Sequence, residues 1–268
     1  MGRVLCIANQ KGGVGKTTTA VNLAASLAVA GKRTLLVDID PQGSATSGLG
    51  LRELSDRPTT YDIIMGERTV GDAVIPAQVP NLALVPAHRD LVGAEVELVS
   101  VLAREYRLRE ALKPVRATYD FILIDCPPSL GLLTVNGLTA ADGVLIPLQC
   151  EYYALEGLSA LMDTVDLIRE RLNQALVIEG IVLTMFDTRN SLSHQVSEEV
   201  RRHFSGRVYR TVIPRNVRLS EAPSHGLPVT VYDPASRGAQ AYLDLAREII
   251  EPATVATVDP AATTDDQR

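Results

Sequence analysis

The chain has 268 residues, a formal net charge of −6 and 46% hydrophobic residues, which excludes a disordered or fibrous protein and allows a sizeable buried core. No stretch approaches the roughly 18 consecutive apolar residues that cross a bilayer, and the N-terminus lacks the ordered regions of a signal peptide, so we expect a cytoplasmic protein. Cys6, Cys126 and Cys150 have no CxxC spacing and the four histidines have no ligand spacing, which argues against a disulfide framework and against zinc.

Short apolar runs alternate with helix-like segments along the chain. Thr18–Ala30 is typical of a helix stopped by Gly31. Leu155–Leu172 predicts a second helix whose apolar stripe is formed by Leu158, Leu161, Val165, Leu167 and Ile168. The runs typical of strands buried on both faces are Val4–Ala8, Thr34–Ile39, Leu82–Val85, Phe121–Ile124, Val144–Leu148 and Ile181–Met185.

This alternation predicts a doubly wound α/β fold with a mostly parallel sheet flanked by helices. We expect residues 1–251 to form a single domain, because no composition break precedes Pro252. Residues 252–268 lack aromatic residues and periodicity, so we expect a disordered C-terminal tail. We expect the first strand to begin near Arg3 and therefore expect no N-terminal domain before it.

A glycine-rich segment follows the first predicted strand and reads Lys11-Gly12-Gly13-Val14-Gly15-Lys16-Thr17-Thr18. Glycines let backbone N–H groups at a helix N-terminus approach an anion that a Cβ would exclude. In a P-loop, Lys16 would reach the β- and γ-phosphates, and the Thr17 hydroxyl would coordinate Mg²⁺. The segment therefore predicts a site for ATP and Mg²⁺.

One position departs from the ordinary P-loop pattern. The pattern requires a glycine where Gln10 stands. Lys11 follows it directly, so that two lysines bracket a tight glycine loop. That arrangement is the signature of the deviant Walker A group.

Carboxylates close two of the predicted strands. Asp125 ends the run Phe121–Ile124, where a side chain at the carboxyl end of a parallel strand points into the ligand crevice and can hold Mg²⁺. Asp38 and Asp40 stand at alternate positions at the end of the second strand and share one face. We expect Asp38 to lie nearer the metal and Asp40 to orient the attacking water.

With these motifs the chain resembles the ParA/Soj-type partition ATPases, whose wider group includes MinD-type ATPases and the nitrogenase iron protein. The resemblance spans Val4 to about Ile250. It rests on Lys11–Thr18, Asp38–Ser44 (DIDPQGS), Asp125–Ser129 (DCPPS), Glu151–Leu158 (EYYALEGL) and Pro214–Pro223 (PRNVRLSEAP).

The resemblance implies an ATP-bridged homodimer in which Lys11 contacts the phosphates bound by the partner subunit. Such a lysine supplies the charge that phosphoryl transfer needs, so hydrolysis would require dimerisation. The resemblance also places adenine against Pro214 and Asn216.

The segment Arg189–Arg218 holds seven arginines and two glutamates, a balance of +5 that leaves −11 for the rest of the chain. Such segregation suits a face that binds DNA phosphates without sequence preference. The resemblance implies that Arg189 and Arg218 contact DNA, whereas Arg215 is open to a nucleotide role instead.

The function implied is chromosome partition. ATP-bound dimers would coat double-stranded DNA nonspecifically, in association with the nucleoid, and a ParB/Spo0J-type partner would stimulate hydrolysis and release.

One alternative is a MinD-like membrane-associated ATPase, which needs a C-terminal basic amphipathic helix. This chain instead ends Asp265-Asp266-Gln267-Arg268, and we therefore expect no membrane partner. Another is an iron-protein-like enzyme sharing a cluster between subunits through cysteines, but Cys126 is expected to pack.

Overall fold

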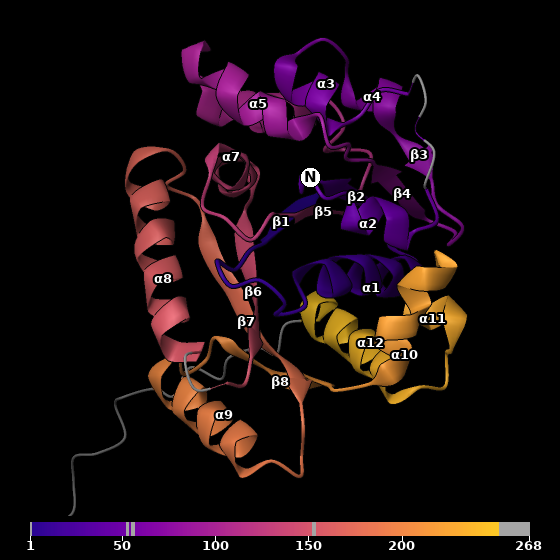
Figure 1. The fold of residues 1–268 in the computed structure, drawn as a ribbon, viewed down its shortest axis with the longest axis vertical. Coiled ribbons are helices and arrows are strands. Elements are labelled where there is room, and N and C mark those ends of the chain that lie inside the picture. The colour runs from indigo at the N-terminus through magenta and orange to yellow at the C-terminus, as the bar shows by residue number, and fades with distance from the viewer. Residues whose placement is uncertain (1, 52–53, 55–56, 152–153, 252–268) are drawn as a thin grey trace, which may run out of the picture.

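The computed structural model describes residues 2–51, 54, 57–151 and 154–251, and the expected C-terminal tail lies outside them. The described residues form an eight-stranded sheet in the order β3-β4-β2-β5-β1-β6-β7-β8 (Figure 1). Every neighbouring pair is parallel except β3 with β4. The predicted doubly wound, mostly parallel fold is confirmed.

The strands are β1 Arg3–Ile7, β2 Thr34–Asp38, β3 Ile75–Pro76, β4 Leu82–Val85, β5 Phe121–Asp125, β6 Gly143–Gln149, β7 Val177–Phe186 and β8 Val208–Pro214. The helices of the first half are α1 Lys16–Val29, α2 Ser44–Gly48, α3 Thr60–Met65, α4 Val70–Ala73, α5 Leu91–Glu97, α6 Arg107–Leu112 and α7 Leu132–Ala140. Those of the second half are α8 Ala154–Arg171, α9 Ser191–His203, α10 Val217–Glu221, α11 Val229–Tyr232 and α12 Arg237–Ile250.

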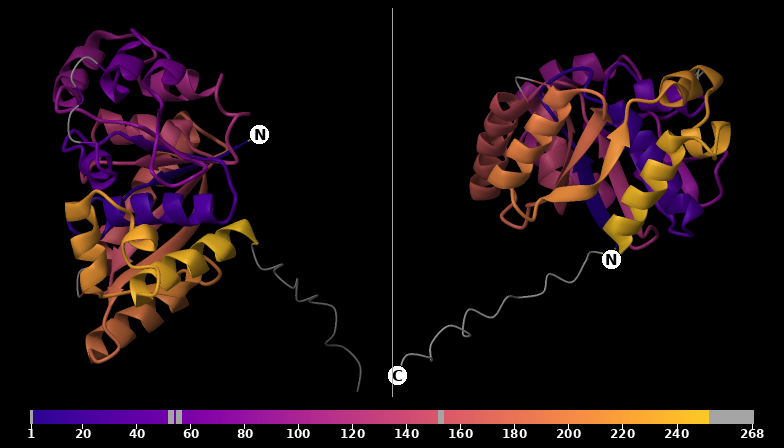
Figure 2. Two further views of the ribbon diagram at one scale, coloured as in Figure 1. Left: turned by 90° about the vertical axis from the view of Figure 1, so that its right-hand side faces the viewer. Right: turned by 90° about the horizontal axis from the view of Figure 1, so that it is seen from below.

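The sheet separates two hydrophobic cores because successive strand residues point to opposite faces. In β1, Val4 and Cys6 join the core that includes α3 to α9, while Leu5 and Ile7 join the core with α1 and α12. α12 packs along α1 on that second face (Figure 2). Burial on both faces explains why the strands read as continuous apolar runs rather than alternating ones.

Several details differ from expectation. The edge strands β3 and β8 were not predicted. β8 carries exposed Arg210 between buried Tyr209 and half-buried Thr211. An edge strand tolerates such a polar residue, so β8 lacks the apolar run of a central strand. In α8, Leu158, Leu161, Val165 and Ile168 are buried but Leu167 is 50% exposed. Residues two apart on a helix are about 200° apart around its axis, so Leu167 cannot share the face of Val165.

All three cysteines are buried and free, so the expectation that Cys126 packs is confirmed. Its Sγ lies 3.1 Å from that of Cys6. No helix of the described residues is long and apolar enough to cross a membrane.

Candidate nucleotide site

The glycine loop connects the carboxyl end of β1 to the N-terminus of α1, at the point where chain connections leave the sheet in opposite directions. Gly13 and Gly15 have φ of 75° and 88°, the left-handed region that glycine adopts without steric cost. A Cβ placed on Gly12 or Gly13 would meet no atom within 4 Å. The space above the loop is therefore open, and the N-terminal amides of α1 form an anion-binding site.

Two side chains fix the loop to the sheet, one from the start of the loop and one from β7. The Asn9 side chain accepts from the Lys11 amide at 3.0 Å and donates to the Pro147 carbonyl at 2.7 Å. The Thr184 hydroxyl donates to the Val14 carbonyl at 2.8 Å. These bonds fix the loop against β6 and β7, so its geometry is set before any ligand arrives.

Lys16 is buried, with 6% of its surface exposed. Its ammonium donates to the Lys11 carbonyl at 3.0 Å. Burial lowers the pKa of Lys16, an effect opposed by the nearby carboxylates of Asp125 and Asp40. A buried ammonium beside open space above a glycine loop is suited to bind phosphate oxygens.

Lys11 lies at the rim of the same loop. Its Nζ forms an ion pair with Glu151, which precedes α8. Both side chains are partly exposed, at 41% and 44%. In the single chain the two lysines are therefore held by acceptors of that chain: Lys16 by a backbone carbonyl and Lys11 by a carboxylate.

Asp125 stands at the carboxyl end of β5 and is completely buried. Both of its carboxylate oxygens lack a hydrogen bond of good geometry within the described residues, although the Thr17 hydroxyl is close enough to act on the carboxylate. Burial, followed by the charge of Asp38, raises the pKa of Asp125 well above its ordinary value, while Thr17 and Lys16 oppose the rise. A buried carboxylate without a partner is costly unless it meets a cation.

Asp38 lies opposite Asp125 in the β2–β5 register but has different surroundings. One of its oxygens accepts from the Thr46 amide and hydroxyl at 2.9 and 2.7 Å, and the other accepts from the Asp40 amide at 3.1 Å. Burial raises the pKa of Asp38 to about 6 in spite of these bonds. Asp38 therefore stabilises the turn after β2 as well as adding negative charge beside Asp125.

Asp40 is 7% exposed and lies in that turn. Its carboxylate accepts from the Gln42 amide at 2.9 Å, and its carbonyl accepts from the Gly43 amide at 2.8 Å. The turn is thus ordered by its own hydrogen bonds, and Asp40 lines the same cavity as Lys16 and Thr17.

These groups fit a magnesium ion. Three buried carboxylates stand beside the Lys16 ammonium, and both oxygens of Asp125 lack a hydrogen bond of good geometry within the described residues. No group of three or more His, Cys, Asp or Glu side chains among the described residues could hold a metal by itself. Mg²⁺ is usually held by one or two protein groups together with water and substrate phosphates, so Thr17 and Asp125 would need bound phosphates to complete a magnesium site.

Two adjoining cavities extend from the loop. The first, about 370 Å³, is lined by Gly12, Lys16, Thr17 and Asp40 among others. The second, about 390 Å³, is lined by Pro214, Arg215 and Asn216. They share Gly15, Thr18, Met185 and Pro223, so a ligand whose phosphates occupy the first can extend its base into the second.

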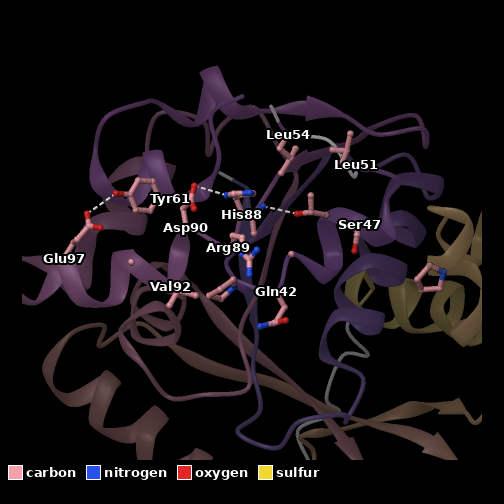
Figure 3. A pocket seen from close by; sticks show the side chains of 16 residues that line it. Gln42, Ser47, Leu51, Leu54, Tyr61, His88, Arg89, Asp90, Val92 and Glu97 are labelled. Atoms are coloured by element: carbon pink, nitrogen blue, oxygen red, sulfur yellow. Dashed lines mark hydrogen bonds and ion pairs between the residues drawn. The ribbon is translucent and has the colours of Figure 1, made fainter. Parts of the chain in front are cut away.

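A larger hollow, about 1140 Å³, lies on the other side of the turn after β2, where Gln42 is one of its lining residues (Figure 3). Four of its side chains are paired with one another, Tyr61 with Glu97 at 2.9 Å and His88 with Asp90 at 2.8 Å. It lacks the glycine loop and the buried lysine. We therefore place the nucleotide site in the two smaller cavities.

The predicted DNA-contacting arginines follow β7 and β8, which are neighbours in the sheet: Arg189 lies in the loop after β7 and Arg218 lies in α10, which follows β8. Arg189 is 88% exposed and pairs with Asp187. Arg218 is held between Glu221 at 2.8 Å and Asp233 at 3.1 Å. Arg215 is exposed and close enough to help lower the pKa of Asp187, after the larger effect of Arg189.

The structure thus brings the P-loop, Asp38, Asp40 and Asp125 to one edge of the sheet, with Pro214 and Asn216 beside them. Asn216 uses its side-chain oxygen to cap α10, accepting from the Arg218 amide at 2.8 Å. Sequence reasoning missed Asn9, Thr184 and Met185. Met185 has a φ of 49° and lines both cavities, and no local pattern could have indicated that conformation.

A parallel sheet with a glycine loop and a buried lysine at its switch point defines a P-loop NTPase. A family model described as an AAA domain matches residues 2–178. The sporulation initiation inhibitor protein Soj of Bacillus subtilis is 60% identical over 249 residues, which is 93% of this chain and 98% of Soj. The chromosome partitioning protein ParA of Myxococcus xanthus is 58% identical, over 94% of this chain and 89% of that protein. The chain belongs to the ParA/Soj family of P-loop ATPases.

The fold comparison agrees. The structure of cobyrinic acid a,c-diamide synthase from Mycobacterium smegmatis with bound ADP and magnesium is 37% identical, with a TM-score of 0.82 over 94% of this chain and 95% of that one. The similarity thus extends to a protein that holds a nucleotide and Mg²⁺.

Proposed function

We propose that the protein is a magnesium-dependent ATPase that partitions chromosomes through an ATP-bound homodimer. The dimer binds double-stranded DNA nonspecifically, associates with the nucleoid, and is released when a ParB/Spo0J-type partner stimulates hydrolysis. The single observation that carries the proposal is the unpartnered, buried carboxylate of Asp125 beside Lys16 and the open glycine loop. The names of the Soj and ParA relatives support the biological role.

In this proposal each residue of the site has one task. The amides of Gly12, Gly13, Val14 and Gly15 bind phosphate oxygens, and Lys16 exchanges the Lys11 carbonyl for the β- and γ-phosphates. Thr17 and Asp125 would hold Mg²⁺, supported by Asp38, and the bound ion would supply positive charge beside the phosphates. Thr18 completes the loop, and Pro214 and Asn216 contact the base.

The chemical step needs two further groups. Asp40 lies at the mouth of the phosphate cavity and orients the attacking water. Lys11, half-exposed at the rim, reaches the phosphates bound by the facing subunit. Because positioned positive charge accounts for most of the catalysis in phosphoryl transfer, hydrolysis depends on dimerisation.

Arg189 and Arg218 form the core of the proposed DNA face. Replacing both with glutamate should strongly weaken ATP-dependent DNA binding at low salt while leaving ATP binding intact. If each contacts one phosphate, the slope of log affinity against log salt falls by about 2. A matched control replaces Arg109 and Arg169 with glutamate, because α6 and the end of α8 lie at the opposite, amino-terminal edge of the strands. Unchanged DNA binding by the first variant would show that the face lies elsewhere.

The proposal is tested by measuring ATPase activity with DNA, with the candidate partner, and with both. Synergistic stimulation by both is expected. Stimulation by anionic vesicles, with firm flotation of the ATP-bound protein, would instead favour the membrane-associated alternative. No described feature of the chain favours that alternative.

A further inference from the structure

Glu151 opens the segment Glu151–Leu158, one of the motifs that mark the family resemblance, but the proposed function gives this residue no task. The structure connects it to the nucleotide loop. Its carboxylate pairs with the Lys11 ammonium, although the two residues lie 140 positions apart in the chain. Strand β6 runs beside β1 and ends at Gln149, shortly before Glu151. The pairing of β6 with β1 therefore places Glu151 near the loop that follows β1.

Lys11 is bonded at three of its atoms within its own chain. Its amide donates to Asn9, its carbonyl accepts from Lys16, and its ammonium pairs with Glu151. The Lys16 bond and the Glu151 pair thus meet on one residue. A phosphate that withdraws Lys16 from the Lys11 carbonyl removes one of the bonds that orient Lys11.

We propose that Glu151 is a positioning residue that holds Lys11 against its own subunit until nucleotide binds, and so limits dimerisation. The inference rests on the proposed function only for the role of Lys11 in the dimer. The carboxylate of Glu151 competes with the phosphates of a facing subunit for the Lys11 ammonium. Breaking the pair is therefore part of the cost of forming the dimer.

The exposure of the Lys11 and Glu151 side chains sets how strongly their pair can oppose dimerisation. Both side chains are more than a third exposed, and such pairs contribute little because water and salt screen them. Removing the pair should strengthen ATP-dependent dimerisation by up to about fivefold. The effect should shrink towards 1 M salt, where the screening length is about 3 Å.

The experiment compares wild type with Glu151→Gln and Glu151→Asp, using light scattering of the full chain with ATP across a range of salt. Glu151→Gln keeps the shape and loses the charge, so its dimer should form at lower protein concentration. Glu151→Asp keeps the charge and should restore behaviour close to wild type. The control is Glu110→Gln, which removes an exposed pair with Lys113 on α6 and should leave dimerisation unchanged. Equal or weaker dimerisation by Glu151→Gln would overturn the inference.

A second measurement needs no dimer. The acetylation rate of Lys11 in nucleotide-free protein, followed by mass spectrometry, should rise in Glu151→Gln because the amine loses its carboxylate. Lys113 should respond in the same way in Glu110→Gln, which shows that the assay detects an exposed pair. If wild type fails to dimerise with ATP while Lys11 still becomes more reactive, the proposed function is wrong and the pair stands. An unchanged Lys11 rate refutes the pair whether or not the dimer forms.

Discussion

Replacing Asp125 with asparagine should stabilise the ligand-free protein at neutral pH and abolish magnesium-dependent hydrolysis. Both carboxylate oxygens of Asp125 are buried without a good hydrogen-bond partner among the described residues, and Asp38 faces it across the strand pair. Asparagine keeps the shape and removes the charge. Asp125, which the proposed chemistry needs, therefore lowers the stability of the nucleotide-free protein.

The magnitude follows from the burial. A buried polar group left unsatisfied costs about 1–3 kcal/mol, and more when it is charged. The opposing contribution is the attraction between Asp125 and Lys16, which the substitution also removes. Because Lys16 keeps Asp40 as a second neighbour of opposite charge, we expect a net gain of about 1–3 kcal/mol in the free energy of unfolding at pH 7.

The direction of the Asp125 pKa shift determines how the stability gain of the asparagine variant changes with pH. The pKa of Asp125 in the folded protein is raised, mainly by burial and then by Asp38. The protonated carboxyl therefore stabilises the fold at low pH, and this contribution is lost as the pH rises through the folded pKa. The advantage of the asparagine variant should accordingly be small in acid and grow towards neutral pH.

Urea denaturation between pH 5 and pH 8 without nucleotide or magnesium measures this difference. Asp120→Asn is a matched control, because Asp120 accepts from the Arg33 amide and guanidinium and has a lowered pKa, caused chiefly by Arg33. Its loss should destabilise the protein slightly at neutral pH, the opposite sign. A less stable Asp125→Asn protein, or a gain independent of pH, would refute the reasoning.

Two further substitutions test the catalytic proposal. Asp40→Ala should retain ATP and remain on DNA as a dimer, seen as slow release in a DNA-dissociation assay, because the water loses its orienting group; a fully active variant would assign that task elsewhere. Gly12→Val should fold normally, since a Cβ at Gly12 meets nothing within 4 Å, yet fail to form the ATP-bound dimer because the side chain projects towards the facing subunit. Gly157→Val on α8, also with open space at its Cβ, is the control, and a Gly12→Val dimer detected by light scattering with ATP would contradict the proposed interface.

Local chemistry explains which parts of the fold could be predicted. Central strands such as β1 and β5 are buried on both faces, so their sequences are uninterrupted apolar runs that indicate a strand. The edge strand β8 is only partly covered, and its mixture of Val208, Arg210 and Ile213 resembles a loop or a helix as much as a strand. The error at Leu167 has a different origin: its place on the helix, about 200° from Val165, already separates it from the buried face, and single exposed hydrophobic residues are common.

For the site, the sequence by itself determined the chemistry. Glycines that free the backbone, a lysine for phosphates and carboxylates at strand ends are local properties, and they were readable from Lys11–Thr18, Asp38–Asp40 and Asp125. The tertiary structure decided which of these groups are already satisfied. The Asp38 carboxylate accepts hydrogen bonds from Thr46, whereas the Asp125 carboxylate has no hydrogen bond of good geometry within the described residues. Lys11 is paired with Glu151, which lies 140 residues further along the chain. Hydrogen bonding and burial depend on what the parallel sheet brings to its carboxyl edge, and that neighbourhood exists only once the strands have been ordered side by side.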